Sequence, residues 1–316
     1  MKQPLLVVAG VTASGKTGLA IELCRRFGGE VVCADSMQIY RGMEIATAAP
    51  TREERAQAVH HLCSFLPIGE SFSVADYAAL ARETIAEIHA RGKLPVLCGG
   101  TGLYISAILD HLDFSGFSGD PALRADLKER AEREGIEPLY RQLCALDPGA
   151  AAKIHPNNRG RVLRALEVTL STGVPMSEHQ RRAKGRECPY RAFALALGYR
   201  ERAGMWGRID RRVDRMMESG LLEEARRFYG RDPGPTACAA IGYKELRPYL
   251  LGECTREEAV ERLKLRTRQY AKRQLTWFKR DERYAWLYVD EYDSPAQLSD
   301  RAAQLTGEAL GLAPRG

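Results

Sequence analysis

The sequence is poor in the features that mark secreted, membrane and zinc-binding proteins. Its eight cysteines include no C-x-x-C pair and no zinc-ligand pattern with histidine, so we expect reduced thiols and no zinc site. The longest uncharged run, Leu94–Leu109, has only 16 residues and is broken by Pro95, Gly99 and Gly100, whereas a membrane-spanning helix needs roughly 20 apolar residues. The apolar run within Met1–Gly10 is about five residues long, too short for a secretory signal. We therefore expect a cytoplasmic protein that does not enter a membrane.

Low-complexity segments and internal repeats are also absent. Hydrophobic residues make up 45% and charged residues 28% of the 316 positions, close to the averages of folded globular proteins, which excludes a disordered or fibrous chain. The length predicts one large domain or two. The net charge of +6 permits an acidic partner such as nucleic acid without demonstrating one.

The first third of the chain alternates between strand-like and helix-like patterns. Gln3–Ala9, Glu30–Ala34 and Leu94–Cys98 are short apolar runs typical of strands buried on both faces of a parallel sheet. Leu80–Ala90 has apolar residues at helical spacing between the second and third of these runs. Strand, helix and strand in this order build right-handed parallel crossovers. We therefore predict an α/β fold of the P-loop type, with helices flanking a parallel sheet.

The middle of the chain changes in character. Strand-like runs vanish between residues 113 and 190, where helical segments rich in Arg, Glu and Ala take over. Ala192–Leu197 then returns the chain to the sheet, and the helical patterns Arg208–Tyr229, Ala239–Tyr249 and Arg256–Lys279 follow. We predict a core of residues 1–112 and 191–316 with C-terminal helices, and a helical insertion domain of residues 113–190.

A phosphate-binding loop follows the first strand. Residues 10–17, GVTASGKT, fit G-x-x-x-x-G-K-[ST] between a strand and a helix, which is the context that this motif requires. Glycines let successive backbone N–H groups and the helix N-terminus point at an anion. Lys16 would contact terminal phosphate oxygens, and the Thr17 hydroxyl would hold Mg²⁺. The predicted phosphate-binding residues are Gly10, Thr12, Ala13, Ser14, Gly15, Lys16 and Thr17.

The usual second half of a nucleotide hydrolase is missing. The strand Leu94–Cys98 ends in Gly99, Gly100 and Thr101, and not in the Mg²⁺-binding Asp of a nucleotide hydrolase. Asp35 is the one carboxylate at a strand end near the loop. Open parallel sheets bind ligands outside the carboxyl ends of their strands, which places Asp35, Thr101 and the loop around one crevice. Such a crevice suits a phosphate-bearing electrophile and a carboxylate base, although Asp35 and Thr101 could each simply cap a local turn or helix.

Two basic segments have open interpretations. Arg211, Arg212 and Arg215 lie close together on one helical surface. The simpler interpretation is that this surface faces solvent. The segment Arg256–Arg283 carries ten Lys and Arg against five Asp and Glu, interleaved with aromatic residues. It suits contact with a phosphate backbone, but one face of the same helix could be ordinary core.

These residues together resemble the tRNA dimethylallyltransferase family, whose members modify adenosine 37 beside the anticodon. The resemblance rests on blocks that run in order over almost the whole chain. They are GVTASGKT (10–17), ADSMQIYRGMEIATA (34–48), GGTGLY (99–104), KIHPNNRGRVLRALEV (153–168), RIDRRVDRM (208–216), AAIGYKEL (239–246) and RQYAKRQLTWFKR (268–280). Two departures are that Val11 stands where the family commonly has Pro, and that the zinc finger of many eukaryotic members is absent.

The resemblance implies a reaction and a catalytic set. The loop would hold the diphosphate of dimethylallyl diphosphate, which explains the missing hydrolase parts. Asp35 would be the general base that takes a proton from N6 of the adenine. Thr101 would lie beside the reacting centre, and Lys16, Arg212 and Mg²⁺ on Thr17 would stabilise the leaving diphosphate. The product would be N6-(dimethylallyl)adenosine 37.

The resemblance also implies a tRNA interface. The helical insertion would grip the anticodon stem-loop, and the enzyme would act as a monomer. The positions that match family contacts with tRNA are Asp35, Ser36, Met37, Gln38, Arg159, Gly160, Arg161, Val162, Leu163, Ile241, Gly242, Tyr243, Lys244, Arg268 and Arg273.

Three alternatives stand beside this reading. A small-molecule P-loop kinase would need neither the block at residues 153–168 nor the basic C-terminal helix. An adenylate isopentenyltransferase has a small acceptor, so the insertion would be superfluous. A non-enzymatic RNA-binding module would not need Lys16, Thr17, Asp35 and Arg212 together.

Overall fold

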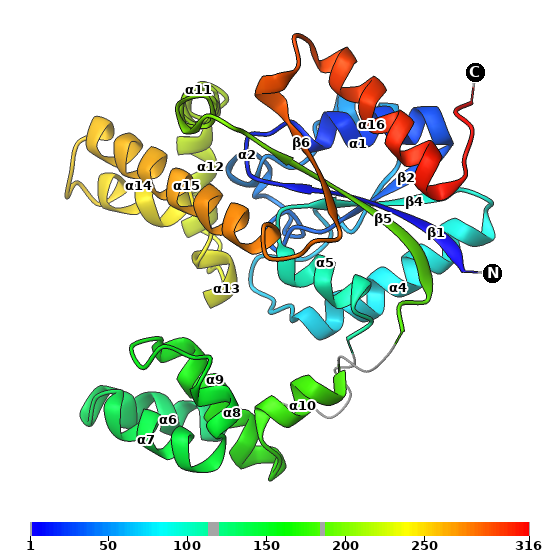
Figure 1. Ribbon diagram of the computed structural model, residues 1–316. Helices are drawn as coiled ribbons and strands as arrows, with labels where there is room; N and C mark the ends of the chain where they lie inside the picture. Colours follow the sequence, from blue (N-terminus) through cyan, green and yellow to red (C-terminus); the bar gives the residue numbers. More distant parts are fainter. Residues whose placement is uncertain (1, 113–119, 184–186, 316) are drawn as a thin grey trace. The chain divides into compact units, whose positions relative to one another are not determined.

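The computed structural model describes residues 2–112, 120–183 and 187–315, and these form two compact units. The sheet unit contains the chain up to Leu109 and again from Pro189. The helical unit is formed by the intervening part of the sequence, within Asp110–Cys188 (Figure 1). The expected start of the insertion, residue 113, lies outside the described residues. None of the described helices is both long and apolar enough to span a membrane.

The sheet unit is built on six parallel strands, which confirms the predicted α/β class. The strand order is β3-β2-β4-β1-β5-β6, so the first strand lies inside the sheet between β4 and β5. Most of the β1 residues are fully buried, as its apolar run predicts. The strands are β1 (Gln3–Gly10), β2 (Gly29–Cys33), β3 (His60–His61), β4 (Leu94–Gly99), β5 (Tyr190–Gly198) and β6 (Tyr284–Tyr288).

Helices cover both faces of this sheet (Figure 1). On one face α1 (Lys16–Phe27) and α16 (Pro295–Leu310) pack on each other and share a core with the strands. On the other face lie α4 (Val74–Ala90) and α5 (Gly102–Leu109). The connection after β2 carries two short helices, α2 (Glu44–Thr47) and α3 (Arg52–Gln57). The carboxyl ends of β1, β2 and β4 therefore open toward loops that carry polar residues.

Near one edge of the sheet, a buried carboxylate is paired with three more exposed side chains. Glu30 on β2 is 3% exposed. Its carboxylate accepts from Arg91 and His61 at 2.7 Å each and pairs with Lys93 at 2.8 Å. Burial raises the pKa of Glu30, but the hydrogen bonds from Arg91, Lys93 and His61 outweigh it and lower the pKa to about 2. The cluster ties β2 to the segment that follows α4, and it contains no residue of the phosphate-binding loop.

The C-terminal helices form a second core within the sheet unit. The helix expected over Arg208–Tyr229 is in fact two helices, because Gly220, with φ at 92°, breaks it. The pair α14 and α15 lies side by side and packs together (Figure 1). The elements are α11 (Arg202–Glu218), α12 (Leu221–Tyr229), α13 (Pro235–Cys238), α14 (Tyr243–Leu250), α15 (Arg256–Phe278) and the 3-10 turn Val289–Glu291.

The helical unit has its own apolar core. It includes the fully buried side chains of Leu127, Leu139, Val162 and Leu166. Glu167 is buried beneath this core and is paired with Arg124, whose guanidinium donates at 2.7 Å and 3.0 Å. The helices are α6 (Pro121–Arg133), α7 (Glu137–Leu146), α8 (Pro148–Ala151), α9 (Arg159–Thr172) and α10 (Met176–Ala183).

Candidate active site

The phosphate-binding loop turns sharply between β1 and α1. Gly10 has φ at 139°, and a Cβ there would lie 2.3 Å from the Leu197 carbonyl oxygen on the neighbouring strand. Gly15 has φ at 86° and caps the N-terminus of α1. Ala13 also adopts a left-handed conformation, with φ at 63°, and its carbonyl accepts from the Tyr199 hydroxyl at 2.9 Å. The loop is therefore held in shape by β5 and the residue that follows it.

Two side chains of the loop fold back on its own backbone. Ser14 Oγ donates to the Val11 carbonyl at 2.8 Å, and Lys16 Nζ donates to the same carbonyl at 2.7 Å. Burial lowers the pKa of Lys16 to about 8, and the nearby charge of Arg212 adds to this effect. Val11, which replaces the usual family Pro, keeps its amide, and that amide donates to Leu197 at 3.2 Å. Lys16 thus reaches over the loop with donor capacity left for an anion.

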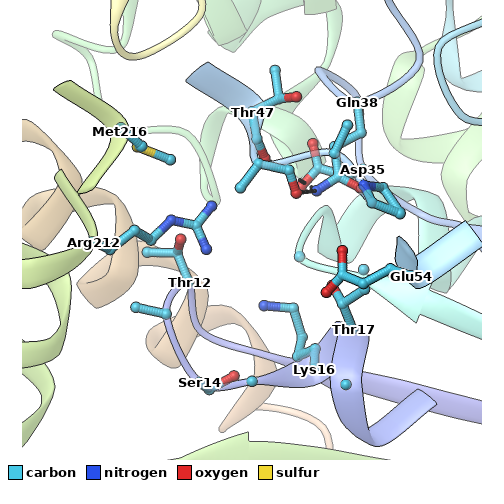
Figure 2. A pocket seen from close by; sticks show the side chains of 18 of the residues that line it. Thr12, Ser14, Lys16, Thr17, Asp35, Gln38, Thr47, Glu54, Arg212 and Met216 are labelled. Atoms are coloured by element: carbon cyan, nitrogen blue, oxygen red, sulfur yellow. Dashed lines mark hydrogen bonds between the residues drawn. The ribbon is translucent and has the colours of Figure 1, made fainter. Parts of the chain in front are cut away.

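A cleft of about 2300 Å³ opens beside the loop. Lys16, Asp35 and Arg212 point into it from α1, the segment after β2 and α11 (Figure 2). Burial lowers the pKa of Arg212, which has no ion-pair partner within the described ranges, while the charge of Asp35 raises it. Of the predicted phosphate-binding residues, Thr12, Ala13, Ser14, Gly15, Lys16 and Thr17 line the cleft, and Gly10 is buried behind it.

Asp35 and Thr101 lie on adjacent strand ends, as expected from the sequence. One Asp35 oxygen accepts from the Met37 amide at 3.0 Å, so part of the capping alternative is realised, but the carboxylate also lines the cleft. Thr101 Oγ1 accepts from the Ser36 amide at 3.0 Å, and the Thr101 amide donates to the Ala34 carbonyl at 3.1 Å. Thr101 does not line the cleft. It fixes the segment that carries Asp35.

Gln274 on α15 joins two strand ends, a role for which no local sequence pattern is specific. Its Oε1 accepts from the Thr12 amide at 2.8 Å, and its Nε2 donates to the Gly100 carbonyl at 3.0 Å. The side chain is buried, and a Cβ on Gly100 would lie 2.2 Å from Nε2. Tyr270, one turn earlier, also lines the cleft, and burial raises its pKa. One face of α15 was expected to be ordinary core. Through Tyr270 and Gln274, part of that face lines the cleft.

Gln38 and Glu54 line the opposite wall. Gln38 Nε2 donates to the Thr47 and Ala48 carbonyls at 3.1 Å and 3.0 Å, which ties down the segment around α2. Glu54 closes a capping box with Thr51, but its side chain also lines the cleft, as that of Thr17 does (Figure 2). Glu54 is not among the site residues predicted from the sequence, although the T-x-x-E pattern of the capping box marks it.

The predicted tRNA-contact residues of the sheet unit divide into two sets. Lining the cleft are Asp35, Ser36, Met37, Gln38, Ile241, Gly242, Lys244 and Arg273. Tyr243 is fully buried, stacks on Phe228 at 4.0 Å and donates its hydroxyl to Glu224 at 2.9 Å. Arg268 lies outside the cleft lining and is paired with Asp210, its Nε donating at 2.9 Å. These two side chains have structural partners.

The predicted contacts of the helical unit lie at the start of α9. Arg159, Gly160 and Arg161 are exposed, whereas Val162 is fully buried and Leu163 is half-buried. Asn158 caps this helix by accepting from the Arg161 amide at 3.3 Å. The exposed N-terminal turn is thus the part of this segment that can meet a partner.

The site, on this fold, defines an enzyme of the P-loop α/β class that acts on a phosphate-bearing substrate. The sequence model described as IPP transferase matches residues 38–281, and that described as Isopentenyl transferase matches residues 3–62. The chain belongs to the IPP transferase family, and it is a prenyltransferase. This confirms the resemblance seen in the sequence.

Named relatives and solved structures agree with this family. The chain is 46% identical over 286 residues to the tRNA dimethylallyltransferase of Bacillus subtilis, covering 90% of each sequence. It is 44% identical over 299 residues to that of Caldanaerobacter subterraneus, covering 94% of this chain and 95% of the relative. The tRNA isopentenylpyrophosphate transferase of Bacillus halodurans matches with a TM-score of 0.72 and 39% identity, over 98% and 97% of the two chains. A eukaryotic dimethylallyltransferase, described as acting on tRNA, matches with a TM-score of 0.82 and 30% identity over 98% of this chain and 80% of that one.

Proposed function

We propose that this chain transfers the dimethylallyl group of dimethylallyl diphosphate to N6 of adenosine 37 in tRNA, releasing diphosphate. The observation that carries the proposal is the convergence of Lys16, Arg212 and Asp35 on one cleft beside the loop. Two cations and a row of loop amides suit a diphosphate, and a carboxylate suits a base. The choice of prenyl donor rests on the family of the chain, and the choice of tRNA as acceptor rests on the names of its relatives.

The loop residues bind the leaving group. Amides of the loop and the N-terminus of α1 face the diphosphate, while Lys16 and Arg212 donate to its oxygens. As the C1–O bond of the donor breaks, its electron pair passes to the diphosphate, whose negative charge grows. Cations already fixed in a partly buried cleft stabilise that charge without reorganising.

Asp35 acts on the acceptor. The exocyclic N6 amine of adenine is a poor nucleophile because its lone pair is delocalised into the ring. As N6 forms its bond to C1, an N6 proton passes to the Asp35 carboxylate. Thr101 holds Ser36 and so positions Asp35, which makes it a positioning residue in this structure.

Mg²⁺ fits the donor set at the loop. Mg²⁺ is commonly held through few protein oxygens together with the phosphates of its substrate. Thr17 would hold it, and Glu54 lines the same cleft. When bound, Mg²⁺ would neutralise charge on the leaving diphosphate.

The acceptor adenine must leave the base stack to reach the cleft. The wall formed by Ser36, Met37 and Gln38, together with Ile241–Lys244, would receive the flipped nucleotide. The buried Tyr243 would hold this wall in place, because its hydroxyl donates to Glu224. The exposed turn Arg159–Arg161 of the helical unit would contact the anticodon stem-loop. We propose a cytoplasmic enzyme that acts as a monomer on one tRNA.

Transfer of label from radiolabelled dimethylallyl diphosphate tests the function. The reaction contains Mg²⁺ and no ATP, with an unmodified anticodon stem-loop RNA, the same RNA carrying G at position 37, or AMP. We expect label in the first RNA alone. Label in AMP alone would favour an adenylate isopentenyltransferase. Absence of label in every acceptor would refute the proposal and revive a P-loop kinase.

A further inference from the structure

A second, smaller pocket lies between α14 and α15. It has a volume of about 410 Å³ and is lined by Ile241, Lys244, Glu245, Arg262, Arg266, Gln269 and Arg273. Four of these residues follow one face of α15, at spacings of four, three and four residues, so that their side chains form one stripe. Four of the seven lining side chains are cationic, and one is an acid.

The acid does not neutralise these cations. Glu245 is 3% exposed, and its Oε2 accepts from the Gly242 amide at 2.9 Å, closing the start of α14. Lys244 Nζ lies 3.9 Å from the other Glu245 oxygen and donates to the Ala239 carbonyl at 3.1 Å. Within the described residues, Arg262, Arg266 and Arg273 have no carboxylate partner. Arg266 donates to Gln269 at 2.9 Å.

Two other cations on the same helix, Lys264 and Arg268, are paired. Arg268 binds Asp210, and Lys264 pairs with Asp214 at 2.8 Å and with Glu261 at 3.3 Å. Helix α11 thus supplies carboxylates to one side of α15, whereas the stripe facing the pocket has none. Clustered like charges repel, so an unneutralised group of three guanidinium groups indicates an anion that arrives from outside.

The small pocket is continuous with the active-site cleft. Ile241, Lys244 and Arg273 line both. A nucleic acid whose base enters the cleft therefore has its backbone near this pocket. We propose that Arg262, Arg266 and Arg273, with Lys244, form a binding site for backbone phosphate of the RNA substrate outside the modified nucleotide. The inference rests on the proposed function and extends it, because Arg262 and Arg266 lie outside the motifs that relate this chain to its family.

Salt dependence distinguishes a phosphate contact from a structural role. Each neutralised phosphate contributes about 0.7 to 0.9 to the slope of log affinity against log salt. In the double variant Arg262→Gln/Arg266→Gln, which preserves helix propensity, that slope should fall by about one. The loss of RNA affinity between 50 and 200 mM salt should then be about threefold smaller than in the wild type. The KM for dimethylallyl diphosphate should not change.

Two controls separate this site from overall charge. Arg25→Gln/Arg301→Gln removes the same net charge from residues that line neither pocket, and it should keep the wild-type slope. Arg262→Lys/Arg266→Lys keeps the charge and should keep the slope as well. Equal slopes in the wild type and Arg262→Gln/Arg266→Gln would overturn the inference, and so would an equal decrease in Arg25→Gln/Arg301→Gln.

The same samples separate RNA phosphate from free phosphate and from failure of the proposed function. In a titration with inorganic diphosphate, Arg262→Gln/Arg266→Gln should bind as the wild type does. Weaker diphosphate binding with an unchanged RNA slope would overturn the inference in favour of a free anion. If the wild type transfers no prenyl group to RNA, the proposed function fails. Normal transfer with unchanged salt slopes refutes only the phosphate pocket.

Discussion

Gln274 allows a direct test of how the site is held together. Its side chain is the bridge between the phosphate-binding loop, through the Thr12 amide, and the end of β4, through the Gly100 carbonyl. Gln274→Leu keeps nearly the same volume and removes both hydrogen bonds. It therefore leaves one donor and one acceptor without a partner and creates little cavity.

The cost follows from the burial of these groups. An unsatisfied buried polar group costs about 1–3 kcal/mol. Gly100 is buried, whereas Thr12 is half-buried and lines the cleft, where water can replace part of its lost bond. We expect Gln274→Leu to lower the free energy of unfolding by about 2–4 kcal/mol. Because the loop loses its fixed amide, the KM for dimethylallyl diphosphate should also rise.

Urea unfolding and steady-state kinetics measure these two effects. Gln304→Leu is the matched control, because Gln304 is exposed on α16, where its side chain accepts from Arg301 and donates to Glu308, both at 2.9 Å. Its free energy of unfolding should change by no more than about 0.5 kcal/mol. If Gln274→Leu behaved like Gln304→Leu in both stability and KM, the bridge would have no role in holding the loop.

Further predictions concern three ionisable groups. Asp35→Asn should lower turnover by roughly 10² to 10⁴ and leave donor binding intact; near-normal turnover would remove Asp35 from the mechanism. The pKa of Lys16 is about 8, and a bound diphosphate raises it, so binding near pH 8.5 should take up protons. Calorimetry in buffers of different ionisation enthalpy would show this uptake, and identical heats would contradict it. The pKa of Glu30 is about 2, below its unfolded value of about 4.5, because hydrogen bonds from Arg91 and Lys93 outweigh its burial. Its contribution, at most about 3 kcal/mol, should therefore exist above pH 4.5 and disappear as the pH falls toward 2. Urea unfolding should show Glu30→Gln less stable than wild type at pH 6 and nearly equal to it near pH 2, and a constant difference would refute the linkage.

Much of the sheet could be predicted from local patterns. The apolar runs that became β1, β2, β4 and β5 are bounded by glycine or by helical periodicity, so their positions follow from neighbouring residues. The two edge strands could not be found in this way. β3 has only two residues, and β6 follows a basic helix after a short charged segment that contains no glycine or proline. Both are defined by backbone pairing with a neighbour already in the sheet.

The loop and Asp35 were predictable because their positions depend on strand order alone. Parallel strands place their carboxyl ends at one edge, so a motif after β1 and a carboxylate after β2 must be neighbours. Gln274 was not predictable, because its contact with Thr12 joins residues 262 positions apart. Its place near one face of a helix made it resemble core. The partner of a side chain depends on tertiary packing, which no local pattern records.

The arginines of the C-terminal helices show why composition alone could not locate the site. Arg268 and Arg273 lie on the same helix, yet Arg268 meets Asp210 whereas Arg273 faces two pockets without a carboxylate partner in the described chain. Arg212 on α11 likewise has no carboxylate partner among the described residues, and burial lowers its pKa. An unpaired cation in a cleft opposes folding, because it loses hydration without gaining a counter-ion. An anionic substrate restores that missing interaction, so the cations without partners are the ones whose charge is available for binding.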